Sequence, residues 1–183
     1  MKRFTCAAVA VAFAAMAAPG QASAQVTVGI GGAATIPTGD YGDFANTGWM
    51  GAVGVTVPVG ESGLGVGATG VYGSNGHDEA VVPGTTDLLG ALAHVGFSFA
   101  TGGSMTPYVV GNLGFLQHKW KVDGVDDVTD SGLAFGGAAG LMFPLGSVVG
   151  RVQASYLIGS GDIDGTDFFG IGAGIGIPLG GGM

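Results

Sequence analysis

Cysteine and charged residues are what this sequence has least of. Among 183 residues there is one cysteine, Cys6, and only 10% of the residues are charged. A single cysteine excludes a disulfide-stabilised scaffold, and so few charges leave little material for the surface of an ordinary soluble domain. Disorder is excluded as well, because 47% of the residues are hydrophobic, whereas disordered chains combine low hydrophobicity with high charge. The length fits one domain.

The first 24 residues have the three parts of a secretory signal peptide. Lys2 and Arg3 give a basic start, residues 7–18 are apolar, and Ala22-Ser23-Ala24 offers small residues for cleavage before Gln25. The apolar stretch is shorter than the roughly 20 residues of a spanning helix. We therefore predict that residues 1–24 direct export of a mature chain, residues 25–183, that contains no cysteine.

The mature chain is strongly acidic. Three basic residues, Lys119, Lys121 and Arg151, stand against 13 Asp and Glu, which gives a net charge of −10. Proteins that bind nucleic acid need clustered cations to contact the phosphates. The charge therefore excludes nucleic acid as a partner.

Glycine is abundant, with 40 residues, but it tends to fall at every second position rather than at every third, as a collagen helix would require. Bulky residues occupy the positions between, as where Ile175 and Ile177 flank Gly176. This alternation predicts β-strands with one bulky face and one small face. It occurs in eight segments: 26–34, 49–57, 64–72, 89–99, 107–120, 133–143, 148–158 and 169–177.

The segment 107–120 allows two assignments. One face would carry Tyr108, Val110, Leu116 and Trp120, and the other would carry Val109, Leu113 and Phe115. Both sets are bulky enough for the outer face, and we expect a β-bulge within the segment.

The connections between these segments alternate in length. The long ones cover residues 35–48, 74–85, 121–131 and 159–166, and the short ones cover 59–62, 101–106 and 145–147. In an up-and-down sheet alternate connections emerge at the same end, so the long ones should gather at one end. Twelve of the 13 acidic residues lie in or beside the long connections, and only Glu61 lies in a short turn.

The strand composition indicates which face points outward. A soluble barrel or sandwich would need Lys, Glu, Asp and Thr on its outer face, but the candidate positions hold mostly Gly and Ala, and Arg151 is the only charge away from the strand ends. The bulky face must therefore point to lipid, and the sheet must close, because an open edge would leave backbone groups unpaired in hydrocarbon. The predicted fold class is all-β, an eight-stranded antiparallel up-and-down transmembrane β-barrel formed by residues 25–183.

Aromatic residues near the predicted strand ends fit the interfacial girdles of such barrels. They are Trp49, Tyr72, Trp120 and Phe169 at the end with long connections, and Phe97, Phe99, Tyr108 and Phe143 at the other end.

Short stretches of sequence resemble the small bacterial outer-membrane β-barrels of the OmpA/OmpX type. Residues 37–41, Pro-Thr-Gly-Asp-Tyr, open the first long loop, Pro107-Tyr108-Val109 begins a strand, and residues 132–136 lead to Phe143-Pro144. With the export signal and the even strand number, the resemblance covers the whole mature chain. It implies a porin-like barrel in the outer membrane of a Gram-negative bacterium.

Three local patterns suggest binding sites that their context does not support. Residues 65–70, Gly-Val-Gly-Ala-Thr-Gly, match a dinucleotide fingerprint, but no helix follows to receive a pyrophosphate. The acidic stretches 123–130 and 162–167 lack the ligand spacing of an EF-hand and are interpreted as a solvated rim. His77 is a lone loop histidine beside Asp78, whereas zinc needs three or four ligands.

Four polar residues are expected on inward faces: His94, Arg151, Gln153 and Ser155. A Ser/His pair could suggest a hydrolase, but the predicted strands supply no acidic partner. We interpret the four as a hydrogen-bonded plug in the lumen, with Arg151 held by neighbours such as Gln153 or Ser155. No catalytic residue, cofactor or metal site is predicted.

The expected function is that of a non-enzymatic outer-membrane barrel with a structural or surface-interaction role carried by four long acidic extracellular loops. The alternative is a narrow channel or small-ligand transport barrel, since an eight-stranded interior is filled by side chains or holds one small ligand. A lipid-modifying enzyme is the least favoured class. The expected partners of this monomer are outer-membrane lipid, lipopolysaccharide, and divalent cations held weakly at the acidic loops.

Overall fold

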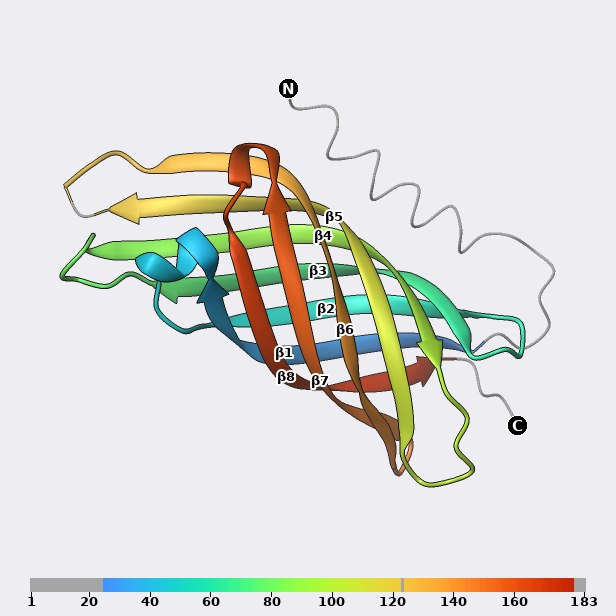
Figure 1. Cartoon of the computed structure of the whole chain (residues 1–183). Coiled ribbons are helices and arrows are strands. Elements are labelled where there is room, and N and C mark those ends of the chain that lie inside the picture. Colours follow the sequence, from blue (N-terminus) through green and yellow to red (C-terminus); the bar gives the residue numbers. More distant parts are fainter. Residues whose placement is uncertain (1–24, 123, 180–183) are drawn as a thin grey trace.

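The computed structural model describes residues 25–122 and 124–179, which form one closed barrel of eight antiparallel strands in chain order (Figure 1). The strands are β1 (Val26–Thr38), β2 (Gly48–Val59), β3 (Leu64–Gly76), β4 (Gly84–Ser98), β5 (Thr106–Val122), β6 (Val128–Leu145), β7 (Val148–Ser160) and β8 (Asp167–Leu179). Two 3₁₀ helices, η1 (Gly39–Asp43) and η2 (Gly161–Ile163), lie in connections. The predicted eight-stranded up-and-down barrel is confirmed, and the predicted leader, residues 1–24, lies outside the described residues.

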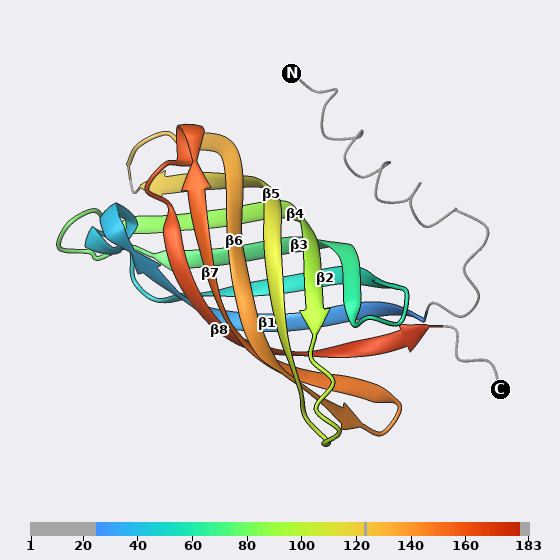
Figure 2. The ribbon, with the colours of Figure 1, turned by 45° about the vertical axis from the view of Figure 1, so that its right-hand side comes forward.

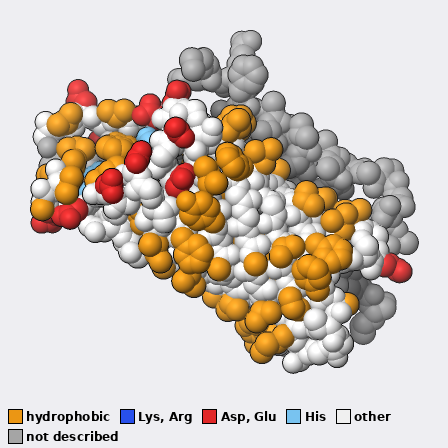
Figure 3. All heavy atoms as spheres, in the orientation of Figure 1, with side chains coloured by type: hydrophobic (Ala, Val, Ile, Leu, Met, Phe, Trp, Pro, Cys, Tyr) orange, Lys and Arg blue, Asp and Glu red, His pale blue; other side chains and the backbone are white. Residues whose placement is uncertain are grey.

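Bulky side chains cover the outside of the wall and small ones face inward. In β8, Ile171, Ile175 and Ile177 are exposed, while Gly172 and Gly176 between them point into the barrel. Apolar side chains accordingly spread over the barrel wall in Figure 3. The described part of the chain has no α-helix long and apolar enough to cross a membrane.

Strand β5 resolves the ambiguity in segment 107–120. Its pairing with β4 and β6 runs without an interruption, so the expected bulge is absent. Val109, Leu113 and Phe115 are exposed, while Tyr108 and Leu116 are buried inside the barrel. Tyr108 therefore does not belong to the aromatic girdle, and the regular alternation of an unbroken strand is the reason. Trp120 also leaves the girdle, because it packs inside the long-loop end with Phe44.

The strands β4, β5 and β6 are longer than predicted, with 15, 17 and 18 residues. Crossing a bilayer needs about 9 to 11 residues, so these strands continue beyond the apolar belt. Asp87, Lys119 and Lys121 lie on these continuations, where charged side chains can meet water. The predicted loops 74–85 and 121–131 are correspondingly shorter, because the residues at both ends of each predicted loop are paired in strands.

Four connections, β1–β2, β3–β4, β5–β6 and β7–β8, emerge at one end of the barrel, here called the long-loop end. The other end, the short-turn end, carries the remaining three connections and both ends of the described barrel (Figures 1 and 2). The strict alternation in length is wrong at the β4–β5 connection, residues 99–105. This connection is as long as the β3–β4 connection, residues 77–83, and longer than the β5–β6 and β7–β8 connections, residues 123–127 and 161–166.

An apolar core fills the half of the lumen next to the long-loop end. Its fully buried members include Leu88, Leu116 and Ile163, which come from β4, β5 and η2. Burying one such side chain contributes roughly 1.5 to 3 kcal/mol relative to leaving it exposed. This core, called the plug below, consists of Val71, Leu88, Leu92, Leu116, Ala134, Leu157, Ile163 and Phe168.

The face assignment predicts unequal tolerance to a buried charge. We expect Ile175→Lys, in the outer apolar belt, to lower the free energy of unfolding by about 2 to 4 kcal/mol, because the ammonium would face hydrocarbon. Asn112→Lys is the matched control, because Asn112 faces the lumen. Reversible denaturant unfolding in lipid vesicles gives both values. Equal losses in the two variants would contradict the assignment.

Candidate functional site

The first candidate site is a cap that closes the long-loop end. The helix η1 and residues 44–47 fold back over the barrel, and Tyr41 of η1 is buried. Backbone hydrogen bonds tie this segment to the β3–β4 connection: Asn46 N–H donates to Gly76 O over 2.7 Å, and Asp78 N–H donates to Phe44 O over 2.7 Å. Two connections far apart in sequence therefore form one structural unit.

Buried polar side chains anchor this unit to the strands. Asn75 donates from Nδ2 to Thr35 Oγ1 over 3.1 Å and to Asn46 O over 2.9 Å. His77 Nε2 lies 2.7 Å from Thr86 Oγ1. All four of the side chains that make these bonds are buried. Since a buried polar group is costly unless it is paired, these bonds fix the position of the cap.

Aromatic rings complete the cap. The ring of Phe44 lies 4.7 Å from that of Trp120 and 5.5 Å from that of His77, measured between centroids. His77, predicted to be a lone loop histidine, is buried by the neighbouring β1–β2 connection. Burial lowers the pKa of His77 and raises that of Tyr41. Both groups are therefore neutral near pH 7.

A second group of contacts joins β5, β6 and the η2 connection. His118 Nδ1 lies 3.0 Å from Thr166 Oγ1, and its Nε2 lies 3.6 Å from a carboxylate oxygen of Asp130. On the outer surface, Lys119 pairs with Asp127 and Lys121 pairs with Asp87. The two lysines of the mature chain are thus engaged by carboxylates.

Exposed acidic residues ring the cap, and we call them the acidic rim. They come from all four long connections: Asp40, Asp43, Asp78, Glu79, Asp126, Asp127, Asp162 and Asp164. Figure 3 shows acidic side chains gathered at this end. Within the described ranges, no group of three or more His, Cys, Asp or Glu side chains is arranged to hold a metal ion. The rim is therefore a surface of dispersed negative charge.

The second candidate site is a cavity of about 560 Å³ between the plug and the short-turn end. All four residues predicted to face the lumen line it: His94, Arg151, Gln153 and Ser155. His94 is held on both ring nitrogens, with Thr56 Oγ1 3.0 Å from Nε2 and Thr69 Oγ1 3.2 Å from Nδ1. The cavity thus brings together side chains from β2, β3, β4 and β7.

Arg151 is positioned differently from the prediction. Gln153 accepts a hydrogen bond from Tyr108 Oη over 2.8 Å, and Ser155 Oγ lies 3.5 Å from Gly170 O. Among the described residues, no hydrogen bond or ion pair joins the guanidinium to another side chain. It lies against glycine, since a Cβ at Gly29 would be 3.0 Å from Nη2. Gln153 and Ser155 bond to Tyr108 and to Gly170 O instead, and the expected bonds to Arg151 are not formed.

A family model described as the outer membrane protein beta-barrel domain matches residues 5–182. The chain belongs to the outer membrane β-barrel family. A search of curated proteins finds no match.

Solved structures of the same fold are similar over almost the whole chain. Neisserial surface protein A gives a TM-score of 0.68 with 13% identity, over 84% of this chain and 97% of that one. The outer membrane protein Ail of Yersinia pestis, in a phospholipid bilayer nanodisc, gives 0.52 with 21% identity, over 85% of this chain and 100% of that one. At these identities the likeness concerns the fold.

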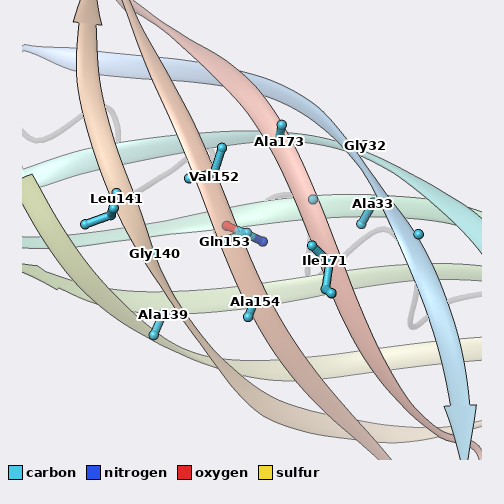
Figure 4. Close-up of a pocket in the computed structure, with 12 residues that line it drawn as sticks. Gly32, Ala33, Ala139, Gly140, Leu141, Val152, Gln153, Ala154, Ile171 and Ala173 are labelled. Atoms are coloured by element: carbon cyan, nitrogen blue, oxygen red, sulfur yellow. The ribbon is translucent and has the colours of Figure 1, made fainter. Parts of the chain in front are cut away.

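This outer membrane barrel also has a shallow hollow of about 680 Å³ on its outer wall, where β6, β7, β8 and β1 meet (Figure 4). Exposed Leu141, Val152 and Ile171 surround it, and Ala139, Ala154 and Ala173 give it its depth. The hollow lies within the lipid-facing belt of an outer membrane barrel. Lipid chains can fill it, so it needs no dedicated partner.

Sequence reasoning missed the polar residues of the cap in this outer membrane barrel. Thr35 and Asn75 lie 40 positions apart, and His118 and Thr166 lie 48 apart. One signal was present in the sequence. Asn75 and His77 lie where a strand meets a loop, and a polar side chain at such a position has no role in a lipid-facing wall. Their partners could be identified only once the loops were folded.

Acid should loosen the cap through His77. Because burial lowers the pKa of His77 from its usual 6.5, the closed cap binds a proton more weakly than an opened cap. The stabilisation is therefore complete above about pH 6.5 and is lost as the pH falls through the lowered pKa of the closed cap. Acrylamide quenching of Trp120 fluorescence, measured in a Trp49→Phe background, should increase over that range.

The matched variants are His77→Gln, which should remove most of the pH dependence, and His118→Gln, which should retain most of it, because the Asp130 carboxylate 3.6 Å from Nε2 of His118 compensates the charge of that ring when it is protonated. His118 provides this control because its ring also contacts Trp120, with centroids 5.9 Å apart. A pH response lost in His118→Gln but kept in His77→Gln would contradict the assignment.

Proposed function

We propose that this outer membrane barrel is a non-enzymatic surface-interaction protein whose binding surface is the acidic rim on its closed cap. In barrels of this class, short turns lie in the periplasm and longer loops lie outside the cell. On that orientation the long-loop end is extracellular. Residues 1–24 would direct the chain to this location as a cleaved signal peptide.

The observation that carries the proposal is the rigid presentation of the rim. The backbone bonds of residues 46 and 78 and the buried bonds of Asn75 and His77 hold two acidic connections together. A rigid surface loses little conformational entropy when it binds, which favours affinity. A surface held rigid by such bonds is better suited to recognition than a flexible loop. Two proteins of similar structure have names that agree with such a role. They are Neisserial surface protein A and Ail, the attachment invasion locus protein of Yersinia pestis.

The chemistry of the rim favours a cationic partner. The acidic side chains are exposed, whereas the lysines at this end are paired with Asp127 and Asp87. Val81 and Val125 are exposed at the tips of two connections, at 57% and 65% of their surface. A basic protein segment with apolar residues complements both features. Divalent cations would bind weakly at the rim and bridge it to anionic lipopolysaccharide.

The plug argues against the alternative role as a channel. Leu88 and Leu116 are fully buried across the lumen, and the η2 residue Ile163 packs with them. A conducting path would have to displace this packed apolar core. An enzymatic role has as little support, because His94 is held by two threonines and has no acidic partner among its hydrogen bonds.

The binding proposal is tested with the barrel in nanodiscs of zwitterionic lipid. A cationic amphipathic peptide should bind the wild type and be released by salt, since exposed charges are screened within about 8 Å at physiological ionic strength. The triple variant Glu79→Gln, Asp126→Asn, Asp162→Asn should bind roughly tenfold more weakly. Glu61→Gln, at the opposite end, is the control that should bind normally. Equal binding by the triple variant and the wild type would contradict the proposal.

Conductance tests the plug. Wild-type barrels in planar bilayers should show no sustained ion current, and Leu88→Ala with Leu116→Ala should open a path by joining the cavity to the cap. Each change also destabilises the barrel by roughly 2 to 5 kcal/mol, so folding is verified first by the resistance of the barrel to SDS before heating. Leu89→Ala, on the outer wall, is the matched control. Steady wild-type conductance would favour the channel.

A further inference from the structure

The lumenal cavity presents a cation without a counter-ion. Among the described residues that line it, Arg151 is the one lysine or arginine, and the one carboxylate is that of Glu61, at the short-turn rim. Glu61 forms no ion pair with Arg151 in the described part of the chain. Inside a membrane barrel an unpaired charge is expensive, and such residues mark ligand or ion sites by default.

The neighbours of Arg151 leave its guanidinium free and add a second donor. Gln153 lies two residues along the same inward face of β7. Its Oε1 accepts the hydrogen bond from Tyr108, so its amide Nε2 remains available to donate into the cavity. The short residues Gly29 and Gly174 provide the space in which the guanidinium lies. The planar guanidinium of Arg151 and the amide of Gln153 together offer hydrogen-bond donors that match the two oxygens of a carboxylate.

The rest of the cavity is suited to an apolar group. Met142 is the cross-strand partner of Arg151 on β6, and Val110 and Leu92 also line the cavity. One positive charge compensates one negative charge, so a doubly charged phosphate would remain partly unpaired here. Access is from the short-turn end, since Pro58, Gly60 and Ser98 of that end line the cavity while the plug closes the other side.

We propose that this cavity binds a small monocarboxylate with an apolar body, which enters from the short-turn end. The carboxylate pairs with Arg151 and accepts from Gln153, and the apolar body contacts Met142. The binding surface on the cap is not involved, so the inference is independent of the proposed surface role.

Benzoate and its uncharged counterpart benzamide are the probes, used with the folded barrel in nanodiscs. The ¹³C-methyl signal of Met142, identified through Met142→Leu, should shift saturably with benzoate because of the aromatic ring current. Benzamide should bind at least about tenfold more weakly, as expected when a charge-assisted hydrogen bond is lost. Arg151→Gln should abolish the difference between the two probes, and Arg151→Lys should retain part of it.

Lys119→Gln is the matched control, because it removes a cation from the outer surface and should leave benzoate binding unchanged. Gln153→Leu should weaken benzoate binding several-fold while Arg151 stays in place, which keeps the test valid if Arg151→Gln fails to fold. The absence of a saturable shift, equal binding of benzamide, or unchanged binding in Arg151→Gln would overturn the proposal. Tighter binding of inorganic phosphate than of benzoate would also overturn it.

Discussion

The hydrogen bonds that close the sheet are the constraint on which the rest of this molecule depends. Strand β1 pairs with β8 from Val26 opposite Leu179 to Thr38 opposite Asp167, so the first and last strands have no free edge. In hydrocarbon, unpaired backbone groups cost several kcal/mol each, and only closure removes them. Closure fixes an interior, and that interior then has to be filled. The apolar outer wall and the small inner face both follow from this requirement.

Glycine solves the problem of filling a narrow lumen with large polar side chains. Three such side chains, those of His94, Tyr108 and Arg151, lie against glycines of nearby strands. A Cβ at Gly67 would stand 2.6 Å from His94 Nε2, and a Cβ at Gly140 would stand 2.9 Å from Tyr108 Oη. At these positions the lumen is therefore filled by side chains that pack against glycine. At Gly29, Gly67, Gly140 and Gly174, the absence of a side chain leaves the space that Arg151, His94 and Tyr108 occupy.

The barrel wall could be predicted because the alternation that specifies it involves only residues that are close together in the sequence. Alternation of bulky and small residues located all eight strands, and the shortage of charge turned their bulky faces outward. The same rule left β5 undecided, since Leu116 and Phe115 are equally apolar, and only continuous pairing with β4 and β6 assigns Phe115 to lipid. A rule that compares residues two positions apart cannot decide between two apolar faces of a strand, because that choice depends on pairing with other strands.

The interior required information that the sequence pattern does not contain. The four predicted lumenal residues do line one cavity, but the partners of Arg151 were wrong, because Gln153 bonds to a tyrosine 45 positions away. The cap has the same character, since His77 is buried by a different connection. Contacts between loops depend on where the strands deliver them in space, and a tilt or a register shift of one strand changes them all.

The joining of connections in the cap also determines what an antibody against this end of the barrel would recognise. Residues 39–47 and 77–83 form one continuous patch only while Asn46 and Asp78 keep their backbone bonds. An antibody raised against the folded barrel would therefore recognise a composite epitope with contributions from both segments. A synthetic peptide copied from either loop alone would lack half of that epitope and the shape that the other half imposes.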